Sequence, residues 1–228
     1  MLSTLFKRRR GPEAATGDNE RLPAAQDPVT EWDAGRWFDH KDFTSDWTSH
    51  NFPVWRDLLG PLKDKAIEIL EIGSWEGRSA VFFLNYLPRS RVTCVDPFTG
   101  NPSFHPGDER YLAVARQSEH RFTQNVAEFG DRVEKIVARS VSALDRLGQA
   151  ARRFDFIYID GSHEQVDVLA DSALAWPLLG AGGILLWDDY EFDLKGERPK
   201  LAIEAFLTVI PGKYEILYRG AQLAIRRL

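Results

Sequence analysis

The sequence is poor in cysteine, with Cys94 as its single thiol among 228 residues. One thiol cannot form a disulfide within the chain. Cys94 also lies in the apolar run RVTCVDPF, where a thiol usually serves as a small buried group. An intrachain disulfide framework is therefore excluded, and we expect a reducing compartment, the cytoplasm.

Long apolar runs and excess basic charge are also missing. No apolar run reaches the roughly 20 residues that a membrane-spanning helix needs, and MLSTLFKRRRG places its basic residues after a short apolar piece, the reverse of a secretory signal. The formal net charge is -5, whereas a general grip on nucleic acid needs a basic face. We expect no membrane or nucleic-acid partner and favour a small molecule.

Composition divides the chain into three parts. Residues 1–30 lack a sustained apolar period and predict a disordered tail whose KRRR cluster is a solvated basic end. Residues 31–62 form an aromatic-rich N-terminal cap, which suits either a ligand-facing surface or simple packing. Its aromatic side chains are Trp32, Trp37, Phe38, Phe43, Trp47, Phe52 and Trp55. Residues 63–228 are expected to form the main domain.

In the main domain, apolar runs of strand length alternate with helical patterns. The expected strands are 66–72, 91–96, 133–138, 154–160 and 182–187, and the expected helices are 77–87, 107–128, 140–152, 163–179 and 198–209. The C-terminal KYEILYRGAQLAIRRL reads as a β-hairpin. This order predicts an α/β fold: a doubly wound, Rossmann-like, mostly parallel seven-stranded sheet, with helices on both faces and a C-terminal antiparallel hairpin. Such sheets bind ligands outside the carboxyl ends of their strands.

The loop EIGSWEG follows the first strand and opens the first helix. Gly73 permits a backbone conformation closed to other residues, and Gly77 lets a ligand approach the start of the helix. Asp96 ends the second strand, where a carboxylate can accept both hydroxyls of a ribose. The loop and the acid together predict a cofactor that contains a nucleoside.

The spacing of this loop distinguishes between cofactors. A dinucleotide site uses G-x-G-x-x-G, whereas this chain has G-x-x-x-G with Trp75 in place of the second glycine, which disfavours a pyrophosphate. Glu71 would repel phosphate but tolerate a cationic ligand. S-adenosylmethionine combines adenosine with an ammonium and a sulfonium, and it is the cofactor we expect.

The stretch EIGSWEGRSAV resembles the first motif of class I S-adenosylmethionine-dependent methyltransferases. The resemblance is strongest to the metal-dependent small-molecule O-methyltransferases of the catechol type, and it covers about residues 66–190. It implies cofactor contacts from the loop Gly73 to Gly77, including Ser74 and Trp75, with Ser79 at the methionine carboxylate. It also implies that Asp96 binds the ribose and that Ser140 lies near the adenine, although Ser140 also reads as an ordinary helix N-cap.

Three acids end two further strands. Asp160 follows FDFIYI, while Asp188 and Asp189 follow GGILLW. Adjacent strands would bring these carboxylates to one rim, where like charges repel unless a cation or protons intervene. Oxygen ligands favour a hard ion such as Mg2+. The alternative is that Asp160 contacts the cofactor while the other two only cap a turn.

The resemblance places all three acids on the metal-ligand positions of the catechol-type enzymes, with Asp189 where those enzymes commonly have Asn. Macrolide-sugar O-methyltransferases, with two consecutive acids, are more similar here. His163 corresponds to the general base of the catechol type, and an imidazole suits that role near neutral pH. A His at the start of a helix can instead bond only to backbone. His50 and His105 are the other candidate bases, and loop 97–110 is a candidate lid.

These features predict a methyltransferase that moves a methyl group from S-adenosylmethionine to a hydroxyl of a small molecule, with Mg2+ or a similar cation. Binding to one metal favours an acceptor with neighbouring oxygens. The alternatives are a nicotinamide-dependent oxidoreductase on a related sheet and a non-catalytic cofactor-binding protein. The sequence leaves open the acceptor, the need for metal, the oligomeric state and the roles of the tail and of loop 97–110.

Overall fold

The architecture is that of a computed structural model, which describes residues 34–101 and 105–228. The predicted tail, Trp32 of the predicted cap and residues 102–104 of the candidate lid lie outside the described residues. Asp33–Leu228 form one compact unit, so the cap segment and the α/β sheet belong to the same body.

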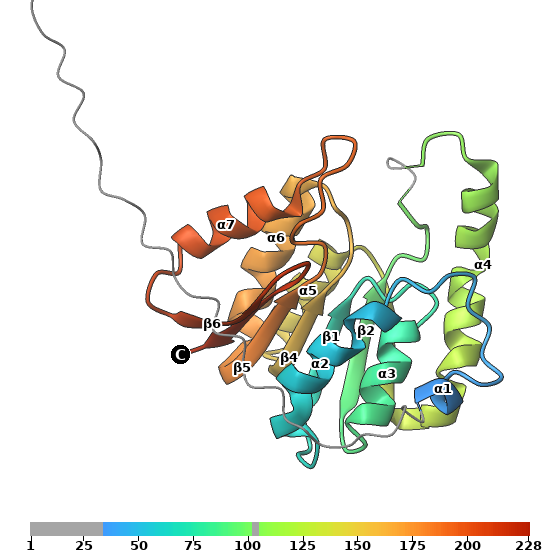
Figure 1. Cartoon of the computed structure of the whole chain (residues 1–228), viewed down its shortest axis with the longest axis horizontal. Helices are drawn as coiled ribbons and strands as arrows, with labels where there is room; N and C mark the ends of the chain where they lie inside the picture. Colours follow the sequence, from blue (N-terminus) through green and yellow to red (C-terminus); the bar gives the residue numbers. More distant parts are fainter. Residues whose placement is uncertain (1–33, 102–104) are drawn as a thin grey trace, which may run out of the picture. The chain divides into compact units, whose positions relative to one another are not determined.

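One mixed sheet forms the centre of this unit, with the strand order β3-β2-β1-β4-β5-β7-β6 (Figure 1). The first five strands run parallel, and β7 runs antiparallel to both β5 and β6. The strands are β1 Glu68–Ile72, β2 Arg91–Asp96, β3 Val133–Val137, β4 Phe154–Ile159, β5 Leu179–Trp187, β6 Tyr214–Arg219 and β7 Leu223–Arg227. The predicted doubly wound sheet with its C-terminal hairpin is confirmed.

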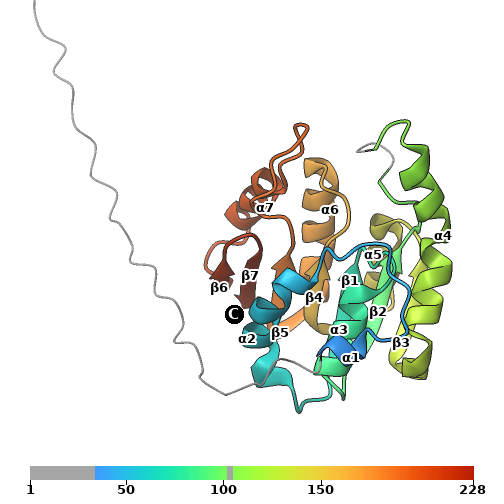
Figure 2. The ribbon, with the colours of Figure 1, turned by 45° about the vertical axis from the view of Figure 1, so that its right-hand side comes forward.

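Helices lie on both faces of the sheet (Figure 2). They are α1 Ala34–Trp37, α2 Phe52–Leu59, α3 Arg78–Tyr86, α4 Glu109–Asn125, α5 Ser140–Gln149, α6 Gln165–Ala175 and α7 Pro199–Thr208. Short 3-10 turns cover Ser49–Asn51, Gly60–Leu62, Ala127–Arg132 and Trp176–Leu178.

Most predicted boundaries differ from the structure by one to three residues, and three differences have a clear local cause. The helix expected at 107–128 begins after Asp108, whose side chain caps it by accepting from the backbone N–H groups of Arg110 and Tyr111. The helix expected at 163–179 begins only at Gln165 and tightens into a 3-10 turn that contains Pro177. The fifth strand begins earlier than expected, because Leu179 pairs with Phe154 across a bulge despite the glycines that follow.

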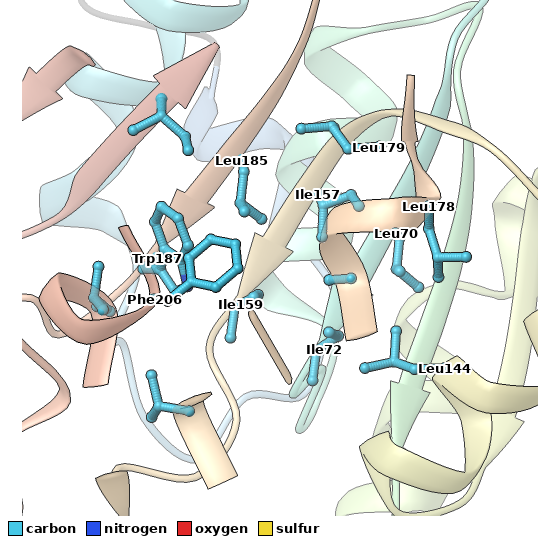
Figure 3. Close-up of a cluster of buried hydrophobic side chains, with 14 of the residues drawn as sticks. Leu70, Ile72, Leu144, Ile157, Ile159, Leu178, Leu179, Leu185, Trp187 and Phe206 are labelled. Atoms are coloured by element: carbon cyan, nitrogen blue, oxygen red, sulfur yellow. The ribbon is translucent and has the colours of Figure 1, made fainter. Parts of the chain in front are cut away.

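The core on one face of the sheet joins alternate residues of β1, β4 and β5 to α5, α6 and α7. Figure 3 shows Leu70, Ile157 and Leu185 pointing into this layer, which Leu144 and Phe206 close from the helices. Because side chains alternate along a strand, the residues between them point to the other face.

That other face carries an aromatic layer that joins α2 to α3. Trp55 is fully buried and lies 4.9 Å from Phe83 and 5.2 Å from Tyr158, ring centre to ring centre. Phe52 stacks on Phe82 at 4.4 Å. Much of the predicted cap is therefore packing, whereas Trp47 keeps 58% of its surface exposed.

Candidate active site

The predicted site residues gather at the carboxyl ends of β1, β2, β4 and β5, neighbouring strands in the sheet. Gly73 follows β1, Asp96 ends β2, Asp160 follows β4 and Asp188 follows β5. This is the edge at which parallel α/β sheets bind ligands. The parallel register thus brings together residues that are far apart in the sequence.

Gly73 fits its place only because it has no side chain. Its φ is +88°, and an added Cβ would overlap the carbonyl oxygen of Asp160 and lie 2.7 Å from the Cα of Gly161. Gly77 also has a positive φ, +83°, at the N-cap of α3. Gly73 therefore lets the loop turn tightly against the end of β4, in the backbone conformation that the sequence predicted for it, whereas an added Cβ on Gly77 would press on Phe122 and Val126.

Asp96 is tied to the glycine loop. Its Oδ2 accepts a 2.8 Å hydrogen bond from the backbone N–H of Trp75, and its Oδ1 accepts one of 2.6 Å from Phe98. Burial raises the pKa of Asp96, and these N–H groups oppose the rise. The predicted ribose acid thus also fixes the loop, and Trp75 adopts a left-handed φ of +46° there.

Glu71 is completely buried at the start of the loop. Neither carboxylate oxygen has a hydrogen-bond partner in the described part of the chain, and burial raises the pKa of Glu71, against the nearby hydroxyls of Ser74 and Ser79. Neighbouring strands place Cys94 and Tyr158 on either side of it in register. A buried acid without a partner is costly, and a cationic group close to it would offset that cost.

Ser140 does not cap its helix as the alternative interpretation expected. Arg139 occupies the N-cap, and Ser140 is the first helical residue. The Ser140 hydroxyl instead lies beside Asp171, a buried acid of α6 whose pKa burial raises to about 6. The N-cap interpretation is wrong because the chain turns into the helix one residue earlier.

Asp160, Asp188 and Asp189 form one cluster. Each offers an oxygen, and these oxygens lie within 4.8 Å of one another. Burial and the repulsion of its neighbours raise the pKa of Asp160 well above its ordinary value, and the pKa of Asp188 rises for the same reasons. The expected meeting of the three acids at one rim is observed.

Tyr158 links two of these acids. Its hydroxyl, completely buried, lies 2.9 Å from Asp160 Oδ2 and 2.6 Å from Asp188 Oδ2. Burial and both carboxylates raise the pKa of Tyr158 well above 10, so its hydroxyl stays a donor. The sequence analysis missed this residue, although the strand alternation that buries Glu71 also places Tyr158 on the same face.

His163 lies between two carboxylates. Its Nε2 is 2.9 Å from Asp189 Oδ2, and its Nδ1 is 3.5 Å from Glu197 Oε2. Burial lowers the pKa of His163, but the bond to Asp189 and the surrounding carboxylates outweigh it and raise the pKa. His163 precedes α6 and bonds to side chains, so the expectation of a first-turn residue bonded only to backbone is wrong. Its role as a base stays a prediction.

The cap segment reaches the glycine loop through Glu76, which is 1% exposed. Its two oxygens accept from the backbone N–H of Thr44 at 2.7 Å and from the Thr44 hydroxyl at 2.9 Å. The Trp75 ring stacks on Tyr111 at 5.9 Å and lies 5.9 Å from Trp47 with the two planes tilted by 33°, and Tyr111 stacks on His105 at 3.8 Å. His50 is exposed.

A separate cavity lies away from the carboxyl edge of the sheet and supplies no reactive side chain to the candidate site. It encloses about 330 Å³ near the amino ends of β1 and β2. Two of its cations are paired, Arg91 with Asp131 and Arg152 with Glu134. Arg132 donates to backbone carbonyls. We therefore place the functional site at the carboxyl edge.

The donor set fits a hard divalent cation and a sulfonium cofactor. Three carboxylates within 4.8 Å supply oxygen ligands and a charge that favours a cation. The partnerless carboxylate of Glu71 and the strained loop beside Asp96 suit a positively charged nucleoside ligand.

Among the described helices, none is long and apolar enough to cross a membrane.

Comparison with known proteins agrees with this arrangement. The sequence profile of a family described as "Methyltransferase domain" matches residues 70–190, more than half of the chain. A curated relative, "Uncharacterized protein R132" of Acanthamoeba polyphaga mimivirus, is 23% identical over 146 residues, which cover 62% of this chain and 59% of that protein.

Two solved structures share the fold. The MycE methyltransferase of the mycinamycin biosynthetic pathway, in complex with Mg, SAH and mycinamycin VI, aligns with a TM-score of 0.57 and 17% identity over 85% of this chain and 52% of that chain. The O-methyltransferase TomG of Streptomyces achromogenes, in complex with SAM, gives 0.56 and 18% over 86% of each.

The chain therefore spans little more than half the length of the viral protein and of MycE. The family match runs from β1 to just beyond β5 and so contains the glycine loop, Asp96 and all three clustered acids. It confirms the resemblance predicted from EIGSWEGRSAV. The chain belongs to the methyltransferase-domain family.

Proposed function

We propose that this protein transfers a methyl group from S-adenosylmethionine to a hydroxyl of a small molecule, with Mg2+ or a similar divalent cation at the acid cluster. The observation that carries the proposal is the placement of a glycine loop and Asp96 beside three clustered carboxylates on one edge of the sheet. Two solved structures with this fold support it, since MycE is in complex with Mg and SAH and TomG is in complex with SAM.

The cofactor would lie across the ends of β1 and β2. The loop from Gly73 to Gly77 would approach its methionine part, with Ser79 at the carboxylate and Glu71 near the ammonium. Asp96 would accept hydrogen bonds from the ribose hydroxyls. Ser140, which lies beside Asp171, would be near the adenine. When bound, S-adenosylmethionine supplies an electrophilic methyl group, and a divalent cation lowers the pKa of a hydroxyl.

Asp160, Asp188 and Asp189 would hold the cation and thereby position the acceptor. Two neighbouring acceptor oxygens, as in a vicinal diol or a catechol, suit a single cation that keeps open positions. The main contribution of these residues is orientation, because holding two reactants at attack distance can remove several kcal/mol from a barrier.

His163 would take the proton of the acceptor hydroxyl. The carboxylates of Asp189 and Glu197 on either side of the ring raise the pKa of His163 and so make the neutral imidazole a stronger base. The contact between His163 and Asp189 also orients the imidazole ring, as a general base requires.

The test is methyl transfer from labelled S-adenosylmethionine to a panel of diols and catechols, with and without a chelator. Wild type, Asp188→Ala and the exposed control Asp145→Ala are compared. We expect chelator and Asp188→Ala to abolish turnover and Asp145→Ala to retain it. Equal rates in every case would remove the cation from the proposal but leave the methyl transfer.

Calorimetry separates the proposal from the alternatives. Binding of S-adenosylhomocysteine but not of NADH is expected, and the reverse would favour an oxidoreductase. Saturable binding without turnover on any acceptor would favour a non-catalytic cofactor-binding protein.

A further inference from the structure

The carboxylate of Asp188 accepts hydrogen bonds from four donors, three of which come from distant parts of the chain. Its Oδ1 accepts from Gln222 Nε2 at 3.0 Å and from the backbone N–H of Asp189 at 2.9 Å. Its Oδ2 accepts from the Tyr158 hydroxyl at 2.6 Å and from Asn51 Nδ2 at 3.4 Å. A carboxylate has about four lone-pair sites. All of them are occupied, so a cation can bind Asp188 only where a donor gives way.

Gln222 is held in a single orientation by a second buried bond. Trp55 Nε1 donates to Gln222 Oε1 at 3.0 Å, and the two side chains are 0% and 1% exposed, respectively. An indole N–H can only donate, so the amide oxygen must face it and the amide NH2 must face Asp188. A flip of the amide would leave buried donors and acceptors unpaired, which is unfavourable.

Asn51 is the weakest of the four partners. Its contact with Asp188, at 3.4 Å, is well beyond the usual 2.9–3.0 Å of an N–H···O bond. The residue lies in the 3-10 turn just before α2, where a small shift of one side chain would release the carboxylate oxygen. Tyr158, at 2.6 Å and in the middle of the sheet, has no such freedom.

We propose that Gln222, fixed by Trp55, is a positioning residue that orients Asp188 toward the divalent cation, and that Asn51 is the donor that the cation displaces. The inference rests on the proposed function for the presence of the cation. It extends the site to α2 and to the turn before β7, two elements that are far apart in the sequence but in contact through Trp55 and Gln222. Loss of such an outer partner typically weakens metal affinity about 10- to 100-fold.

The test is calorimetric titration of the full chain with Mg2+ and with Mn2+, without S-adenosylmethionine. Gln222→Met removes both hydrogen bonds at nearly constant volume, and Gln124→Met makes the same change at an exposed position of α4. We expect the Kd of Gln222→Met to rise about 10- to 100-fold and that of Gln124→Met to stay at the wild-type value. A purely structural Gln222 would move the urea midpoint and leave the metal Kd unchanged, which would overturn the inference.

Two further variants keep the test decisive if Gln222→Met does not fold. Trp55→Phe removes the indole donor together with part of a fully buried ring, and the folded variant should bind the metal severalfold more weakly; wild-type affinity in the folded variant would overturn the role of Trp55. Asn51→Ala should bind Mg2+ at least as tightly as wild type, because a competing donor is gone. A tenfold loss there would overturn the displacement of Asn51.

The wild-type titration separates the two proposals. If wild type binds S-adenosylhomocysteine but neither ion, the metal part of the proposed function and this inference both fall. If wild type binds the ions and folded Gln222→Met binds them equally well, the positioning role falls and the proposed function stands.

Discussion

Gly73 and Asp160 meet backbone to backbone where β1 and β4 end, so closely that a Cβ on Gly73 would overlap the Asp160 carbonyl oxygen. The Asp160 N–H also donates to Ile72 at 2.8 Å. The loop expected to bind the cofactor is therefore packed against the first acid of the cluster, and the position of one determines the position of the other.

Gly73→Ala should consequently destabilise the protein by more than about 4 kcal/mol, because overlap with backbone adds to the strain of a left-handed residue. Gly182→Ala is the matched control. Gly182 has a φ of +73° and nothing within 4 Å of an added Cβ, so it isolates the strain at about 1–2 kcal/mol. Urea denaturation measures both, and equal losses would show that the contact with Asp160 is unimportant.

Tyr158→Phe removes the hydroxyl between Asp160 and Asp188 with little change in shape. We expect the free energy of unfolding to fall by about 2 kcal/mol at pH 7, since a hydrogen bond to a charged group contributes about 1.5–3 kcal/mol. Tyr214→Phe on β6, whose half-buried ring packs at the margin of the core, should change it by less than about 0.5 kcal/mol. A Tyr158→Phe variant as stable as the control would contradict the bridging role.

Asp171 predicts a pH dependence of stability. Burial raises its pKa in the folded protein to about 6, above the roughly 3.9 of an unfolded chain. The folded state binds the proton more tightly, so this contribution to stability is fully present below about pH 4 and is lost as the pH rises through about 6.

Asp171→Asn should therefore remove up to about 3 kcal/mol of the fall in unfolding free energy between pH 4 and pH 7. Asp145→Asn, at an exposed position of α5, should leave the profile unchanged. The measurement is the urea midpoint at each pH. If the midpoints of wild type and Asp171→Asn change in parallel with pH, the raised pKa of Asp171 is refuted.

Glu76→Gln should loosen the cap segment from the glycine loop. The substitution places an amide group where two oxygens accept from Thr44, with an expected loss of about 2 kcal/mol and faster hydrogen exchange at the Thr44 amide. Glu128→Gln removes a charge whose side chain is 60% exposed and leaves the Lys41 ammonium its hydrogen bond to the Asn125 carbonyl, so it should cost less than about 1 kcal/mol. Unchanged hydrogen exchange at the Thr44 amide in Glu76→Gln would show that Glu76 does not hold the cap segment to the glycine loop.

Local sequence patterns were enough to predict the sheet and the residues at its edge. Alternating apolar and helical patterns fix a parallel sheet, and in such a sheet the residues that end β1, β2, β4 and β5 must meet at one edge. The glycine spacing with Trp75, the acid Asp96 and the three acids Asp160, Asp188 and Asp189 could therefore be found from local pattern alone.

The groups that surround these residues depend on tertiary packing and could not be predicted from local patterns. Asn51 and Asp188 are 137 residues apart, and Trp55 and Gln222 are 167 apart, so no local pattern connects them. The partner of Ser140 and the two carboxylates beside His163 likewise come from other elements. Strand alternation fixes which face a side chain occupies, but its hydrogen-bond partners depend on how helices, turns and the hairpin pack around it.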